Sequence, residues 1–109
     1  MLYFSIVKRM KNKVDNHEWI NEDTDVLFEA ILKLENLDEA RRFFRDLLTE
    51  KEIIEFGQRW KVARMLEKGI KYTKTEQETG VSSATIARIQ KWLKKGRGGY
   101  KLMLKRIKS

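Results

Sequence analysis

Cysteine and proline are absent from this chain of 109 residues, and His17 is its only histidine. Without cysteine there is no disulfide framework and no thiolate chemistry. A zinc or iron site built from thiolate and imidazole is therefore not expected, and the sequence indicates no cofactor. The lack of proline together with a charged fraction of 37% is typical of a helical protein with well-solvated outer faces.

Long apolar runs are also missing. No stretch approaches the roughly 18 to 20 residues that span a bilayer. Residues 1–7 are apolar, but they have no preceding basic region and no small-residue cleavage site, and Lys8 and Arg9 follow at once. We interpret this segment as an apolar tail or as an over-long gene start with Met10 as the true initiator. Lacking an export or membrane signal, the protein is expected to be cytoplasmic, with no membrane partner.

Charge is distributed unevenly along the chain. Residues 1–56 hold 9 basic and 13 acidic side chains, a net charge of −4, whereas residues 57–109 hold 15 basic and 3 acidic ones, a net charge of +12. A basic half on one small domain is the electrostatic pattern expected for a polyanionic partner. A solvated charged face is the alternative explanation of this pattern.

Helical periodicity predicts an all-α fold of about six helices, with no strand pattern. Residues 1–22 form a poorly patterned arm, and residues 23–109 form a single helical domain. Within that domain we expect a dimerisation core over 23–69, a helix-turn-helix over 70–95 and a C-terminal helix over 96–109. Expected helix starts and stops are Asp23-Thr24, Asp38, the capping box Thr49–Glu52, the stop Gly69, a second capping box Thr73–Glu76, the stop Gly80, and the cap Ser82.

The first three predicted helices carry more large apolar side chains than a unit of under fifty residues can hide. Leu27, Ile31, Phe43 and Leu47 lie on such apolar stripes. Unburied stripes favour a partner, and a second copy of the chain is the simplest one, so we expect a homodimer. Coverage of the stripes by the C-terminal half of the same chain is the alternative.

The segment from Tyr72 to Leu93 is typical of a helix-turn-helix. Gly80 supplies the residue tolerant of positive φ, Val81 an apolar anchor, and Ser82 the cap of a second helix. On that helix Ile86, Ile89 and Leu93 are expected to face inward. The remaining outer face and the flanking cations predict binding to double-stranded DNA. The candidate DNA-binding residues are Lys71, Tyr72, Lys74, Ser82, Ser83, Ala84, Thr85, Ala87, Arg88, Lys91, Lys94 and Lys95.

These candidates have different expected roles. Arg88 is the candidate for bidentate contact to guanine, while Ala84 and Ala87 are small enough to meet a thymine methyl group. The flanking cations would neutralise phosphates and set register without reading sequence; these are Lys71, Lys74, Lys94, Lys95 and Arg97. The first helix of the motif is a weak scaffold, because Thr75 and Thr79 stand where aliphatic residues are usually buried. Trp60, Trp92 and Tyr100 could stack on single strands, but their helical spacing favours the core.

Several short motifs follow one another in a specific order along the chain. They are Leu47-Leu48-Thr49-Glu50, Gln58-Arg59, Val62-Ala63-Arg64-Met65-Leu66, Tyr72, Thr79 to Ile89, and Gly99-Tyr100-Lys101. In this combination the sequence resembles the tryptophan-repressor superfamily, and more closely its YerC/YecD branch, from about Thr24 to Ile107. The resemblance implies an all-helical, intertwined dimer with one helix-turn-helix in each subunit, acting in transcription.

In tryptophan-responsive members of the superfamily, two arginines and two threonines line the ligand pocket. The resemblance places Thr49, Arg59, Thr85 and Arg88 at the matching positions. Two positions that are small in those members are Ile89 and Trp92 here. A filled interior has no room for an indole without rearrangement, so free tryptophan is not expected to act as a corepressor.

The sequence therefore predicts a sequence-specific, dimeric transcription regulator, with repression as its expected role. A non-specific architectural binder of nucleic acid, or a helical module that docks on another protein, is the alternative. An enzyme is not expected. The carboxylates are spread over helix faces, and the nearby pair Glu50 and Glu52 is better explained as first-turn charge that favours the helix dipole.

Overall fold

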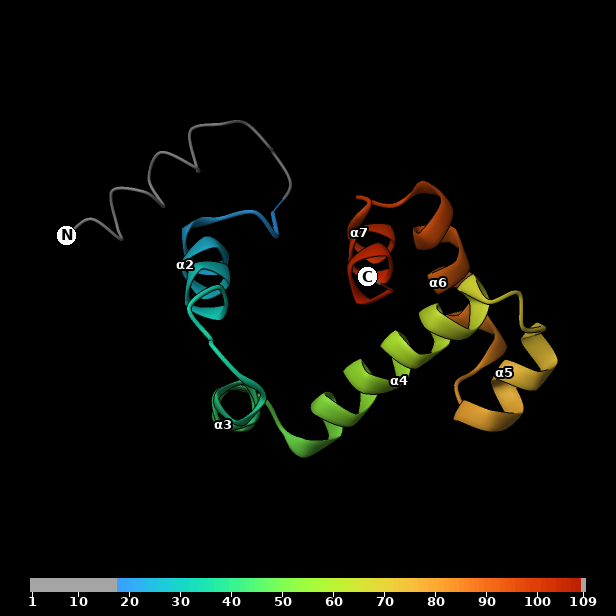
Figure 1. The fold of residues 1–109 in the computed structure, drawn as a ribbon, viewed down its shortest axis with the longest axis horizontal. Helices are drawn as coiled ribbons and strands as arrows, with labels where there is room; N and C mark the ends of the chain where they lie inside the picture. Colours follow the sequence, from blue (N-terminus) through green and yellow to red (C-terminus); the bar gives the residue numbers. More distant parts are fainter. Residues whose placement is uncertain (1–17, 109) are drawn as a thin grey trace. The chain divides into compact units, whose positions relative to one another are not determined.

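The computed structural model describes residues 18–108, which form six α-helices and no strand (Figure 1). This confirms the all-α prediction. The described residues divide into two compact units, with the boundary between Leu47 and Leu48. His17 and most of the predicted N-terminal arm lie outside the described residues. Within the described part, no helix is long and apolar enough to cross a membrane, and no group of three acidic or histidine side chains is placed to hold a metal ion.

Helix α2 (Glu22–Ile31) opens the described part of the first unit. Its N-cap is Asn21, so the start predicted at Asp23-Thr24 is wrong by about two residues. The Asn21 side-chain oxygen accepts from the backbone N–H of Thr24 at 2.9 Å, and the Thr24 hydroxyl accepts from the N–H of Asn21 at 3.0 Å. This reciprocal capping box satisfies two backbone donors, which a start at Asp23 would leave without these partners.

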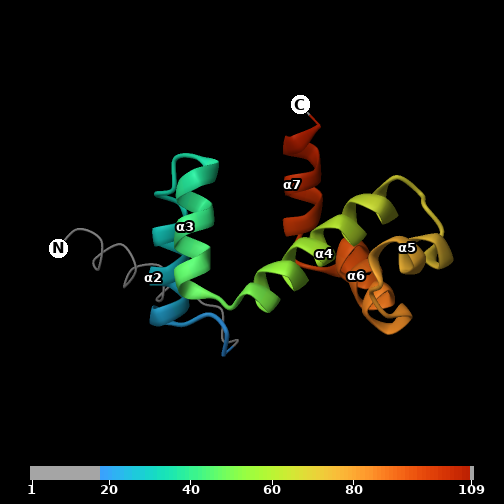
Figure 2. The ribbon, with the colours of Figure 1, turned by 90° about the horizontal axis from the view of Figure 1, so that it is seen from below.

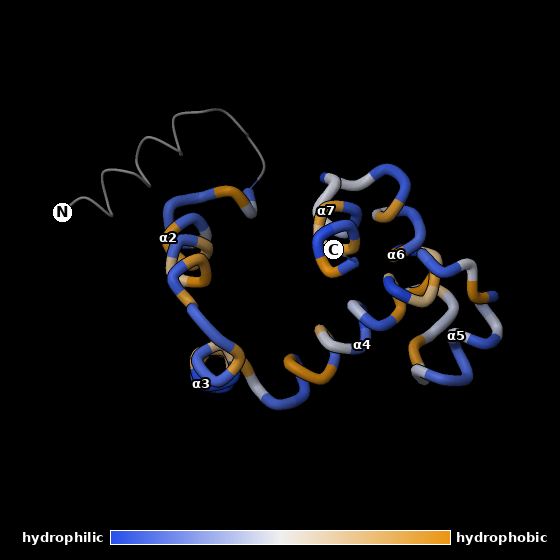
Figure 3. Tube along the Cα trace, in the orientation of Figure 1, coloured by the Kyte–Doolittle hydropathy of each residue, from blue (hydrophilic) through white to orange (hydrophobic). Residues whose placement is uncertain are grey.

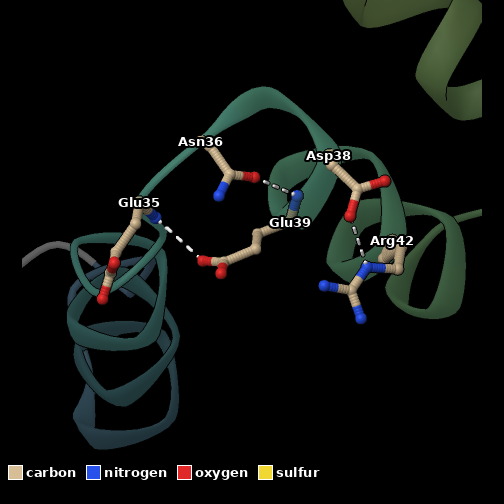
Figure 4. A network of polar contacts seen from close by, with 5 residues as sticks. All are labelled: Glu35, Asn36, Asp38, Glu39 and Arg42. Carbon is tan, nitrogen blue, oxygen red and sulfur yellow. Dashed lines mark hydrogen bonds and ion pairs between the residues drawn. The ribbon is translucent and has the colours of Figure 1, made fainter.

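Helix α3 (Leu37–Leu47) begins one residue before the predicted cap Asp38. The Asn36 side-chain oxygen accepts from the N–H of Glu39 at 2.9 Å, while the Glu39 carboxylate accepts from the N–H of Glu35 at 3.0 Å (Figure 4). The Asp38 carboxylate instead pairs with Nε of Arg42 at 3.0 Å. Asn36 therefore does the capping, and Asp38 is a first-turn charge within the helix.

The apolar side chains of the first unit are poorly covered. Among its described residues no hydrophobic side chain is buried, and α3 has no buried residue at all. Phe28, Leu32 and Leu37 expose 48%, 74% and 64% of their surface. These two helices therefore do not bury their own apolar stripes.

The second unit consists of α4 (Glu50–Glu67), α5 (Tyr72–Thr79), α6 (Ser83–Lys95) and α7 (Gly99–Ile107). Helices α4, α5 and α6 pack on one another, and α7 packs on α6, as both ribbon views show (Figures 1 and 2). The hydrophobic core lies among these helices. It contains Val62, Ala63, Ile86, Ile89, Leu93 and Leu104.

The capping box predicted at the start of α4 is confirmed. The Thr49 hydroxyl accepts from the N–H of Glu52 at 3.1 Å, and the Glu52 carboxylate accepts from the N–H of Thr49 at 2.9 Å. Hydrogen bonds from the Thr49 backbone and side chain lower the pKa of the Glu52 carboxyl below its usual value. At the other end, Gly69 follows the C-cap Lys68 with φ of 80°, as the predicted stop requires.

The three aromatic residues predicted to be core differ in their surroundings. Trp60 and Tyr100 pack against the core cluster, with ring centroids 6.2 Å apart and planes 15° apart. Trp92 does not share this environment, because 50% of its surface is exposed in the single chain. Trp92 is on the same helix as the buried Ile89 and Leu93, but it lies outside the buried face of that helix. The core prediction is therefore wrong for Trp92 within the described chain.

Candidate nucleic-acid interface

Helices α5 and α6 and the turn between them form the predicted helix-turn-helix. Gly80 ends α5 in the left-handed conformation with φ of 71°, and its N–H donates to the Glu76 carbonyl at 2.8 Å. Ser82 caps α6, where its hydroxyl accepts from the N–H of Thr85 at 3.2 Å. The turn residue and the cap are therefore both confirmed in their predicted places.

The start of α5 differs from the prediction. The expected capping box at Thr73–Glu76 is wrong, because the helix begins at Tyr72 and its N-cap Lys71 has no side-chain cap. With this start, Thr75 lies in the first turn and is fully buried, and its hydroxyl donates to the Lys71 carbonyl at 3.0 Å. A buried hydroxyl that bonds to its own helix backbone avoids the cost of an unpaired polar group.

Helix α6 has two distinct faces. Ile86, Ile89 and Leu93 are buried, as predicted, and pack against α4. The opposite face carries the candidate base-reading side chains. Ser82, Ser83, Ala84, Ala87, Arg88 and Lys91 are exposed, and Thr85 is half-buried beside the cap.

The predicted phosphate-contacting cations, with the DNA-binding candidate Tyr72, lie at the two ends of the helix-turn-helix. Tyr72, Lys71 and Lys74 are exposed at the start of α5, and Lys94 and Lys95 are exposed at the end of α6, with Arg97 beyond them. Lys74 lies 3.9 Å from the Glu78 carboxylate, a distance at which a surface pair is worth little. The structure therefore leaves the Lys74 ammonium accessible to a polyanion.

An open cleft of about 270 Å³ separates the first half of α4 from the turn. Sequence reasoning singled out Arg59, Ser82 and Thr85 in this cleft but missed the contribution of Glu55 and Gln58. Their spacing with Arg59 puts all three on one face of α4, yet helical spacing alone does not show that this face meets the turn. The lining residues are Glu55, Gln58, Arg59, Val81, Ser82 and Thr85.

The residues assigned by resemblance to a tryptophan pocket are only partly brought together. Arg59 and Thr85 line the cleft, and the Arg59 guanidinium also lies 5.8 Å from the centre of the Phe56 ring. Thr49 caps α4, and Arg88 is exposed on the outer face of α6. Ile89 is buried in the core cluster.

Comparison with known proteins gives one consistent result. The family model of the Trp repressor protein matches residues 22–108. The uncharacterized protein YerC of Bacillus subtilis (strain 168) is 47% identical over 87 residues, covering 80% of this chain and 84% of that protein.

Solved structures agree. A TrpR-like protein from Eubacterium eligens ATCC 27750 has a TM-score of 0.80 at 39% identity and covers 84% of this chain and 95% of its own. A candidate Trp repressor from Staphylococcus aureus has a TM-score of 0.77 at 43% identity, covering 81% and 88%. The Trp repressor family is regulatory and binds DNA rather than catalysing reactions. Membership of this family therefore indicates a DNA-binding, helix-turn-helix regulator. The chain belongs to the Trp repressor protein family and to its YerC-like branch.

Proposed function

We propose that this protein is a sequence-specific transcription regulator that reads the major groove of double-stranded DNA, acting as a repressor. The observation that carries the proposal is the division of α6 into a fully packed face and an exposed one. Arg88 stands on the exposed face among small side chains, six residues (a little under two turns) after the cap Ser82. Small residues at a helix start allow close approach to base edges, and a guanidinium can bind guanine in a bidentate manner.

Base reading and phosphate binding fall to different residues in this proposal. Ser83, Ala84, Thr85, Ala87, Arg88 and Lys91 face the bases. Tyr72, the capping Ser82 and the flanking cations, namely Lys71, Lys74, Lys94, Lys95 and Arg97, contact the backbone. The basic balance of residues 57–109 supports this assignment, since phosphate neutralisation supplies most of the sequence-independent affinity.

A homodimer is part of the proposal. The exposed apolar side chains of α2 and α3 support it, because the described residues of the first unit bury no hydrophobic side chain on their own. In this arrangement residues 23–69 form the dimerisation core, residues 70–95 read DNA and residues 96–109 add the last helix. Two reading helices related by a two-fold axis require half-sites about 34 to 36 Å apart.

Selection of bound sequences from random duplex DNA at about 0.15 M salt tests the proposal. We expect an enriched palindrome with half-site centres about ten base pairs apart. Sedimentation of the free protein should give twice the mass of one chain. Retention of DNA without enrichment would contradict sequence-specific reading, and a monomer at micromolar concentration would contradict the dimer.

A non-specific architectural binder is the second candidate. The aliphatic-poor helix α5 favours it, because a weakly packed first helix would hold the reading helix loosely. The alternative of a protein-docking module would be favoured if no DNA were retained at all. The same selection therefore separates all three functions.

A further inference from the structure

Three hydrogen bonds converge on Thr79, the last residue of α5. Its hydroxyl donates to the Thr75 carbonyl at 2.7 Å and accepts from the backbone N–H of Val81 at 3.2 Å. Its own carbonyl accepts from the side-chain amide of Gln58 on α4, at a longer 3.5 Å. Thr79 therefore connects the body of α5, the turn and the supporting helix through polar contacts.

In α5 these polar contacts replace the apolar packing that ordinarily attaches such a helix to its neighbours. Helix α5 has no aliphatic residue, and its trace is coloured blue to near-white along its length (Figure 3). Its one buried side chain is Thr75, whose hydroxyl is bonded to the Lys71 carbonyl. Packing alone offers little to define how the chain leaves this helix.

The Thr79 hydroxyl is the hydrogen-bond acceptor for the Val81 N–H. At the end of α5 the Gly80 N–H donates to the Glu76 carbonyl, so that carbonyl already has a donor. Val81 is half-buried against the core cluster. A threonine hydroxyl has one hydrogen and two acceptor lone pairs. Because the hydrogen is donated to the Thr75 carbonyl, the hydroxyl is oriented with a lone pair free for Val81. Losing that acceptor would leave a partly buried N–H unpaired, which is the costly outcome for a backbone donor.

We propose that Thr79 is a positioning residue for DNA recognition: its hydroxyl fixes the turn, and with it the start of the reading helix. The inference rests on the proposed function. Hydrogen bonds to base edges require donor–acceptor distances of about 2.7 to 3.2 Å and good alignment, so they depend on where α6 begins. Long lysine side chains reach phosphates over a range of geometries. Loss of the Thr79 hydroxyl should therefore reduce specific binding and spare non-specific binding.

The test compares Thr79→Val, which removes the hydroxyl and keeps the branched shape, with Thr79→Ser, which keeps the hydroxyl. Thr73→Val is the matched control, since Thr73 is an exposed threonine on the same helix. Amide exchange of Val81 is measured by NMR on the free protein, and unfolding is measured to confirm that each variant folds. Loss of one net hydrogen bond predicts Val81 exchange about three- to tenfold faster in Thr79→Val. Thr79→Ser and Thr73→Val should match the wild type.

The same variants are then titrated with the selected palindrome and with a random duplex of equal length. We expect Thr79→Val to bind the palindrome about three- to tenfold more weakly and the random duplex unchanged. Equal losses on both duplexes, or unchanged Val81 exchange, would overturn the inference. If Thr79→Val does not fold, Thr79→Ala provides a second test, because it also removes the hydroxyl, and the same loss confined to the palindrome is expected. Should the wild type prefer no duplex, the proposed function fails, while Val81 exchange still decides the role of the hydroxyl.

Discussion

The backbone N–H of Gly96 donates a hydrogen bond to the carbonyl oxygen of Trp92 at 2.9 Å, at the last turn of α6. A β-carbon added to Gly96 would lie 2.7 Å from Cε3 of the Trp92 ring and closer still to that carbonyl oxygen. The exposed ring of Trp92 therefore lies over the end of the helix, and the position after α6 has no space for a side chain.

Gly96→Ala should destabilise the protein by about 1 to 3 kcal/mol, because the carbonyl it meets is backbone and cannot move without shifting the helix end. Gly99→Ala is the matched control. Gly99 begins α7, and a β-carbon there would meet no atom within 4 Å. Denaturant unfolding at a fixed protein concentration measures both, and equal stabilities of the two variants would contradict the clash.

The stacked rings of Trp60 and Tyr100 should contribute to the attachment of α7 to α4. Aromatic pairs of this geometry contribute about 0.5 to 1.5 kcal/mol beyond the area they bury. A double-mutant cycle with Trp60→Leu and Tyr100→Leu should give a coupling free energy of that size. Additive losses of stability would mean that the two rings pack independently.

The Glu52 carboxylate should make the stability of α4 depend on pH in the acid range. Its pKa is lowered in the folded protein by hydrogen bonds from Thr49. The contribution is therefore complete above the ordinary glutamate pKa of 4.5 and is lost as pH falls through the lower folded pKa. Glu52→Gln should flatten the loss of stability between pH 5 and 3, a window of about two units around that value.

Glu76→Gln removes a carboxylate outside the capping box and controls for the change in net charge. Unfolding curves of both variants are collected from pH 3 to pH 7, roughly the range in which carboxylates titrate. The explanation fails if the two variants lose their acid sensitivity to the same extent.

Arg88 and Lys94 should respond differently when DNA binding is measured. Arg88→Ala should cost about 1 to 3 kcal/mol on the selected site and relax the base preference there. Lys94→Ala should weaken binding to all sequences alike and reduce the salt slope by about one. Filter binding or fluorescence anisotropy over a series of salt concentrations distinguishes them. Identical behaviour of the two variants would argue that Arg88 reads no base.

Free L-tryptophan should not bind in the micromolar range. Ile89, buried in the core cluster, and the bulky Trp92 stand at the two positions that, by the resemblance, are small in tryptophan-responsive members. Calorimetric titration of the free protein and of the DNA complex checks this expectation. Micromolar binding would show that the cleft accommodates an indole despite Ile89.

Helix periodicity was sufficient to predict most of the helices and the buried side of α6. Ile86, Ile89 and Leu93 recur at helical spacing, and a helix with such a stripe must turn it toward other apolar groups. Local chemistry was equally sufficient at Thr49, Gly80 and Ser82. Their roles depend on hydrogen bonds within three residues or on a single backbone conformation. Both are determined by the types of the neighbouring residues.

Prediction failed where several local solutions compete. Asn21 and Asn36 cap their helices in place of the neighbouring aspartates, and Lys71 precedes α5 in place of Thr73, because each start is chosen by the sum of local bonds and burial. Asparagine and aspartate are about equally good caps, so residue type alone does not choose between Asn21 and Asp23 or between Asn36 and Asp38.

By itself, then, the sequence determined the helical class, the position of the helix-turn-helix and the basic character of its surface, since these depend on residue type and short-range spacing. Only the tertiary structure decided that Glu55 and Gln58 face the turn and that the Trp92 ring stays exposed over Gly96. Those facts depend on which helix faces meet. Contacts between residues more than twenty positions apart, such as Gln58 with Thr79, follow from packing rather than from any local pattern.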